Sequence, residues 1–112
     1  MKVMYLILGA TGLLGNAVFR VFAEKNVENV IGTIRNRRDE QFFSEELRSS
    51  LKVVEDATLM TQIESLLDHQ KPSTVVNCIG ATRANTSDPE QLNEIYAVFP
   101  KNLQRTCESR GI

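Results

Sequence analysis

The stretch that decides the fold reads Ile7-Leu8-Gly9-Ala10-Thr11-Gly12-Leu13-Leu14-Gly15. A continuous apolar run, Val3 to Leu8, leads into the first glycine and predicts a strand that is buried on both faces. Apolar residues then recur at helical spacing and predict one buried helix stripe. They are Leu13, Leu14, Ala17, Val18, Val21 and Phe22. The glycines therefore join a strand to a helix.

Each glycine has a predicted role of its own. Gly9 permits the tight turn, Gly12 lets a diphosphate approach the main chain, and Gly15 lets helix and strand pack closely. The N–H groups and the positive dipole end of the helix then face the anion. The predicted dinucleotide-binding loop comprises Gly9, Thr11, Gly12, Leu13, Leu14 and Gly15. The alternative is a glycine-rich turn that binds nothing. No Gly-Lys-Ser/Thr follows, so the pattern is not that of a Walker loop.

Strands and helices alternate along the rest of the chain. Three further strands are predicted over Asn29–Ile34, Leu51–Val54 and Thr74–Ile79. Helices are expected over Asp39–Arg48, after Asp56 with an apolar face of Leu59, Met60, Ile63, Leu66 and Leu67, and from near Asp88 through Leu92, Ile95, Phe99 and Leu103. A kink or break is expected at Pro100. This order predicts an α/β fold over residues 1–112, a three-layer, open parallel sheet of Rossmann type in the order 3-2-1-4, truncated after about four strands.

The end of the second strand indicates the cofactor. An NAD site usually has an acid there, whereas this chain has Gly32-Thr33-Ile34-Arg35-Asn36-Arg37-Arg38 and no acid before Asp39. An arginine at that point binds a 2′-phosphate through paired, charge-assisted hydrogen bonds. NADP(H) is therefore predicted, with NADPH preferred over NADH. Arg35 is the first candidate and Arg38 the second, and Arg37 is interpreted as part of a solvated loop.

The ends of the third and fourth strands complete the predicted cofactor site, which also includes Asp56, Ala57, Cys78, Ile79 and Gly80. Asp56 either contacts the adenine amino group or caps a helix that begins at Ala57. Gly80 gives a ribose room against the main chain. Cys78 has the simpler alternative of a small apolar filler in a buried strand.

Composition excludes several classes of partner. The 112 residues are 42% hydrophobic and 24% charged with a net charge of −1, so no overall field recruits nucleic acid or an anionic membrane. The first apolar run is too short to span a bilayer and lacks a signal-peptide cleavage site. Two cysteines and one histidine show no metal-binding spacing, and His69 is expected to serve as a cation near a helix end. A cytoplasmic protein with free thiols is expected.

The glycine stretch resembles the opening of the extended short-chain dehydrogenase/reductases, whose spacing is Gly-x-x-Gly-x-x-Gly. Gly32-Thr33-Ile34-Arg35 resembles NADP-preferring members, Asp56 matches an adenine-contacting aspartate, and Val75-Val76-Asn77-Cys78-Ile79-Gly80 resembles the family's fourth strand end. Phe99-Pro100-Lys101-Asn102-Leu103 is similar to the Pro-x-x-Leu helix of the dTDP-4-dehydrorhamnose reductase branch. The resemblance implies a reductase acting on nucleotide sugars.

Two departures from that family concern the chemistry. Tyr96 stands where relatives often have Asn, and the family's catalytic Tyr-x-x-x-Lys, expected after a fifth strand, does not occur in this sequence. Neither Tyr5 nor Tyr96 has a lysine four residues later to lower the phenol pKa. No catalytic residue is therefore assigned, and the chain is predicted to be inactive alone. Thr82 and Arg83 either line the substrate side or belong to an ordinary polar loop.

Two functions remain open at this point. The first is the amino-terminal, NADP(H)-binding portion of a reductase acting on a nucleotide-linked 4-keto sugar. The second is a noncatalytic NADP(H)-binding sensor or regulatory module. A fragment of a longer protein is compatible with the first. The fourth strand is expected to form an open sheet edge, so that isolated residues 1–112 either self-associate through it or are marginally stable.

Overall fold

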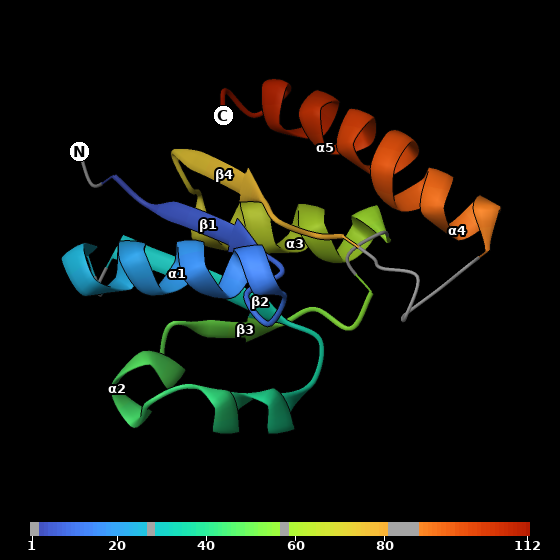
Figure 1. Cartoon of the computed structure of the whole chain (residues 1–112). Coiled ribbons are helices and arrows are strands. Elements are labelled where there is room, and N and C mark those ends of the chain that lie inside the picture. The colour runs from blue at the N-terminus through green and yellow to red at the C-terminus, as the bar shows by residue number, and fades with distance from the viewer. Residues whose placement is uncertain (1–2, 27–28, 57–58, 81–87) are drawn as a thin grey trace.

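Four parallel strands form one sheet in the computed structural model, which describes residues 3–26, 29–56, 59–80 and 88–112 (Figure 1). The strands are β1 (Tyr5–Leu8), β2 (Val30–Ile34), β3 (Leu51–Val53) and β4 (Thr74–Asn77). Their order is β3-β2-β1-β4. The predicted α/β class and strand order are confirmed.

The strand register brings the ends of the central strands together. Ile7 of β1 lies opposite Gly32 of β2, and Leu8 lies opposite Asn77 of β4. The four strands run parallel, so their carboxyl ends meet at one edge of the sheet. The loops that leave this edge carry the candidate site.

Helices cover both faces of the sheet. On one face, α1 (Leu13–Asn26) contributes Phe19 and Ala23 to a core with strand residues such as Ile7. On the other face, α3 (Met60–Gln70) and α5 (Phe99–Glu108) bury Ile63 and Phe99. Figure 1 shows α1 on one side of the sheet and α3 and α5 on the other. The arrangement is the expected three-layer one.

The buried stripe of α1 is the predicted one only in part: Val18 and Phe22 are half-buried and pack against the core, whereas the other four predicted residues are exposed. Leu13 and Leu14 are 96% and 64% exposed, Val21 is half-exposed, and Ala17 is exposed as well. The fully buried residues of the helix are Gly15, Phe19 and Ala23, which are spaced four apart. Close packing of Gly15 against the first glycine turn sets the rotation of the helix. The apolar periodicity of the helix could not predict that contact, because Gly9 lies outside the helix.

The segment between β2 and β3 also differs from its prediction. In place of one helix over Asp39–Arg48, a 3₁₀ helix η2 (Arg37–Phe42) is followed by a short α2 (Glu45–Arg48). Between them, Phe43 is extended and buried in the α1 core, where its ring meets Phe19 edge-on. Burying this aromatic ring interrupts the helix.

The last helical segment has a π-helical turn before Pro100 in place of the kink or break that was expected there. Here α4 (Pro89–Asn93) continues into a π-helical segment η3 (Glu94–Val98) and then into α5. Proline has no N–H to donate to the preceding turn, and the backbone changes its hydrogen-bonding period just before it. None of the helices within the described ranges is long and apolar enough to cross a membrane.

Candidate functional site

The glycine turn after β1 is held by the neighbouring strand β2. The N–H of Gly9 donates to the Thr33 hydroxyl at 2.9 Å, and the N–H of Ala10 donates to the Thr33 carbonyl at 2.8 Å. Gly9 has a φ of +83°, which a residue with a side chain rarely adopts. Thr33 was not predicted as a site residue. Its signal in the sequence is a hydroxyl group within an otherwise apolar, buried strand.

Two of the three glycines are required by packing. A Cβ at Gly15 would lie 1.8 Å from the Gly9 carbonyl oxygen, and a Cβ at Gly9 would lie 3.1 Å from the Cys78 carbonyl oxygen. Gly12 is different, because its Cβ would have only the Gly9 carbonyl oxygen nearby, at an ordinary 3.7 Å. Its φ is also outside the left-handed region. The fold leaves room for a side chain at residue 12.

The turn opens into a cavity of about 320 Å³ at the carboxyl edge of the sheet. Its lining includes eight residues that the sequence predicted, together with five that it did not. The predicted ones are Gly9, Thr11, Gly12, Arg35, Asp56, Cys78, Ile79 and Gly80. The others are Thr33, Ile34, Val54, Glu55 and Ile95. All four strand ends, and the segment η3, therefore contribute to one cavity.

Four predicted residues that the structure describes do not line this cavity. They are Leu13, Leu14, Gly15 and Arg38. The Leu13 and Leu14 side chains are exposed, so their contribution is limited to main-chain N–H groups in the first turn of α1, where such groups have no partner within the helix. Ala57 lies outside the described residues, as do Thr82 and Arg83.

The arginines after β2 have different surroundings. Arg35 is exposed and lines the cavity. Arg37 forms an ion pair with Glu40, and the main-chain N–H of Arg38 donates to the Asn36 side chain at 3.0 Å. The tight 3₁₀ turn that begins at Arg37 carries Arg37 and Arg38 past the cavity.

Asp56 lies in the cavity lining, a few residues before the described start of α3. The helix α3 begins at Met60, its N-cap residue is Leu59, and the Asp56 carbonyl accepts a hydrogen bond from the Leu59 N–H at 3.1 Å. The alternative in which Asp56 caps a helix that begins at Ala57 involves a residue outside the described ranges and stays a prediction. Glu55 beside Asp56 is also exposed to the cavity, which makes this end of the site acidic as well as basic.

Cys78 is half-buried between the glycine turn and the cavity. Its main-chain N–H continues the pairing with β1 by donating to the Leu8 carbonyl at 3.0 Å. Burial raises the pKa of the Cys78 thiol above its ordinary value, which keeps the thiol neutral near pH 7. The group therefore adds neither charge nor nucleophilic reactivity to the site.

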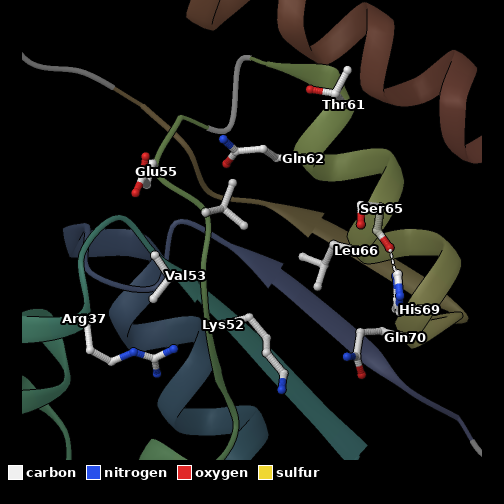
Figure 2. Close-up of a pocket in the computed structure, with 11 residues that line it drawn as sticks. Arg37, Lys52, Val53, Glu55, Thr61, Gln62, Ser65, Leu66, His69 and Gln70 are labelled. Carbon is white, nitrogen blue, oxygen red and sulfur yellow. Dashed lines mark hydrogen bonds between the residues drawn. The ribbon is translucent and has the colours of Figure 1, made fainter.

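A larger hollow, of about 770 Å³, lies between β3 and α3 and is separate from the glycine turn. Figure 2 shows Arg37 and Lys52 on one side, and His69 and Gln70 of α3 on the other. His69 is in the last turn of α3, and its Nδ1 lies 2.8 Å from the Ser65 carbonyl oxygen. None of the twelve predicted site residues within the described ranges lines this hollow. The smaller cavity is the candidate site, because the glycine turn and the predicted residues at the strand ends line it.

Comparison with known proteins supports the fold. Solved structures share the fold at low sequence identity. L-threonine 3-dehydrogenase from Trypanosoma brucei superposes with a TM-score of 0.81 at 13% identity, covering 100% of this chain and 35% of that one. The Bordetella bronchiseptica enzyme WbmG, in complex with NAD and UDP, gives a TM-score of 0.75 at 18% identity, covering 100% and 36%.

Sequence comparison leads to the family. Methionine adenosyltransferase 2 subunit beta from Xenopus laevis is 30% identical over 108 residues, which are 95% of this chain and 29% of that protein. The chain thus spans about a third or less of these three relatives. The model of the NAD dependent epimerase/dehydratase family matches residues 5–112. The chain belongs to the NAD dependent epimerase/dehydratase family, as a portion that contains its nicotinamide-dinucleotide-binding fold.

Proposed function

We propose that the cavity at the carboxyl edge of the sheet binds NADP(H), with the diphosphate resting on the turn between β1 and α1. The observation that carries this proposal is the space at Gly12. Packing requires glycine at residues 9 and 15, but a Cβ at residue 12 would make only an ordinary contact. A ligand that lies against the main chain at residue 12 would leave no room for a side chain, which explains the glycine.

The residues around the cavity fit the parts of a dinucleotide. The first-turn N–H groups of α1 and the positive end of its dipole attract the diphosphate. Arg35, at the end of β2, supplies a guanidinium for a 2′-phosphate, and Asp56, at the end of β3, accepts from the adenine amino group. Cys78, Ile79 and Gly80 present main chain to the second ribose.

In the longer protein, we propose, this portion serves an extended short-chain reductase that acts on a nucleotide-linked 4-keto sugar, as in the dTDP-4-dehydrorhamnose reductase branch. The Pro100–Leu103 pattern supports that branch, and the UDP in the WbmG complex supports a nucleotide-linked substrate. The bound cofactor supplies hydride. This chain's residues bind and orient it, and the proton donor is expected downstream. Reading the coding sequence after codon 112 tests this, because a downstream Tyr-x-x-x-Lys favours the enzyme.

A second function is a noncatalytic NADP(H)-binding subunit. Its support is the 30% identity to a protein whose name describes a subunit of methionine adenosyltransferase. Both functions share the same cofactor cavity. A downstream sequence without Tyr-x-x-x-Lys would favour the subunit.

Titration of Gly12→Ala with NADPH tests the shared cofactor site. We expect the wild-type chain to bind and Gly12→Ala to lose about tenfold or more in affinity, because the new methyl group occupies the diphosphate's position. Val21→Ala is the matched control, since this side chain of α1 is exposed and outside the cavity. Circular dichroism should show the same fold for all three proteins. Equal NADPH affinity for Gly12→Ala and wild type would contradict the proposal.

A further inference from the structure

Tyr96 lies against the main chain of Gly80, at the end of the cavity formed by β4. A Cβ built at Gly80 would lie 3.0 Å from the Tyr96 hydroxyl oxygen and 3.7 Å from two ring carbons. Gly80 itself lines the cavity, three residues beyond the last residue of β4. The phenol group therefore borders the rim of the candidate site.

The π-helical segment η3 holds Tyr96 in this position. The N–H of Phe99 donates to the Glu94 carbonyl five residues earlier, the spacing of a π-helix. Phe99 is fully buried and fixes the segment against the core, while Ile95 lines the cavity. Such widened turns are frequent at functional sites. Here the turn places Ile95 and Tyr96 together at the β4 end of the cavity.

The two ends of the cavity differ in chemistry. Arg35, Glu55 and Asp56 make the end near β2 and β3 polar and charged. Gly80 and Ile95 make the other end neutral, and the adjoining Tyr96 is 56% exposed, with its hydroxyl beside the position that a Gly80 side chain would take. An exposed, fixed aromatic ring beside a neutral surface is suited to stacking with a planar heteroaromatic ring.

We infer that Tyr96 is a positioning residue, a stacking platform that orients the nicotinamide half of the cofactor after it passes Gly80. The inference rests on the proposed function and deepens it. The adenosine half contacts the opposite end of the cavity, so its binding is independent of residue 96. The nicotinamide half, by contrast, loses a packing surface when the ring is removed.

Calorimetric titration with two probes, NADPH and 2′,5′-ADP, tests this division. For Tyr96→Ala we expect NADPH affinity to fall about tenfold and 2′,5′-ADP affinity to stay at the wild-type value. Tyr96→Phe keeps the ring and should bind NADPH like wild type. Val98→Ala is the matched control, because it truncates another exposed side chain of η3.

The outcomes separate the inference from the proposed function. If Tyr96→Ala changes neither affinity, or weakens both probes equally, Tyr96 is not a platform for the nicotinamide half and the inference is overturned. If wild type binds 2′,5′-ADP while NADPH affinity is insensitive to residue 96, the proposed function stands without the inference. If wild type binds neither probe, the proposed function fails and the inference fails with it.

Discussion

The carbonyl group of Gly9 occupies the space that a side chain at residue 15 would need. A Cβ at Gly15 would lie 1.8 Å from the Gly9 oxygen and 2.7 Å from the Gly9 carbonyl carbon. The same turn is tied to β2 by the hydrogen bond from the Gly9 N–H to the Thr33 hydroxyl. The first helix can approach the sheet this closely only because residue 15 has no side chain.

Replacement of Gly15 by alanine should therefore destabilise the fold. The clash is with main chain, which cannot move without disturbing β1, so we expect a loss of about 1–3 kcal/mol in the free energy of unfolding. Urea denaturation followed by circular dichroism measures this loss. Ala17→Ser, at an exposed position of the same helix, is the control. A Gly15→Ala midpoint equal to that of wild type would contradict the packing argument.

Cofactor preference should depend on Arg35. We expect wild type to bind NADPH more tightly than NADH, and Arg35→Ala to lose about tenfold in NADPH affinity through loss of a charge-assisted hydrogen bond, with NADH affinity unchanged. Arg38→Ala should have a smaller effect, because Arg38 does not line the cavity. Arg37→Ala is the control, since this side chain pairs with Glu40. Equal titration curves for NADPH and NADH with wild type would rule out the preference.

The ion pair between Asp68 and Arg110 should make the free energy of unfolding depend on pH in the acidic range. Arg110 donates to both carboxylate oxygens of Asp68, at 2.8 and 3.4 Å, linking α3 to the turn after α5. These hydrogen bonds, followed by the charge of Arg110, hold the pKa of Asp68 below its ordinary value. A carboxyl group whose folded-state pKa is lowered stabilises the fold above its unfolded-state pKa, and the contribution is lost as pH falls through the folded-state value.

Denaturation of wild type and Arg110→Gln at several pH values tests this linkage. Wild type should be the more stable protein at pH 7, by a small margin because the pair is exposed to solvent. The margin should shrink as pH falls below the ordinary aspartate pKa of about 4 towards the lowered folded-state pKa of Asp68. Asp68→Asn should remove the pH-dependent margin in the same way. A difference that stays constant from pH 7 to pH 2 would show that Arg110 acts through packing alone.

The free edge of β4 should allow copies of this chain to associate. In the described part of the chain, β4 pairs with β1 on one side and is the last strand of the sheet. A groove of about 460 Å³ runs along it, with Val75, Leu103 and Cys107 in its lining. Unpaired apolar strand edges add strands from other chains. We therefore expect the sedimentation coefficient of residues 1–112 to rise with concentration.

A charge on this edge should weaken the association. Thr74 is exposed at the start of β4, so Thr74→Lys adds an edge lysine without burying it. Thr61→Lys, at an exposed position of α3, adds the same charge away from the edge and should associate like wild type. A concentration-independent monomer for wild type would exclude the edge as an interface.

Most of the fold was predicted from the regular spacing of apolar residues along the sequence. Apolar runs identified all four strands to within two residues at each end, and alternation with helices was enough to predict their order. The prediction failed where a contact distant in sequence overrode the local pattern. Burial of Phe43 against Phe19 divided the helix expected over 39–48, and the contact between Gly15 and Gly9 rotated α1 away from Leu13 and Leu14.

The candidate site, like the fold, was predicted from the sequence only in part. Spacing alone indicated the glycine turn and the strand ends that gather around it, because parallel strands bring their carboxyl ends to one edge. Spacing could not show which of Arg35 and Arg38 lines the cavity, or that Thr33 holds the turn. Those facts depend on the course of η2 and on a pairing across 24 residues.

The sequence by itself therefore determined the order of the elements, the parallel sheet and the place of the glycine turn, because these follow from local periodicity and from the conformational freedom of glycine. Only the tertiary structure decided which glycines are required by packing, and that Gly12 is not among them. It alone also placed Tyr96 on Gly80. The reason is that close packing depends on atoms brought together from distant parts of the chain, and no local pattern specifies the distance between them.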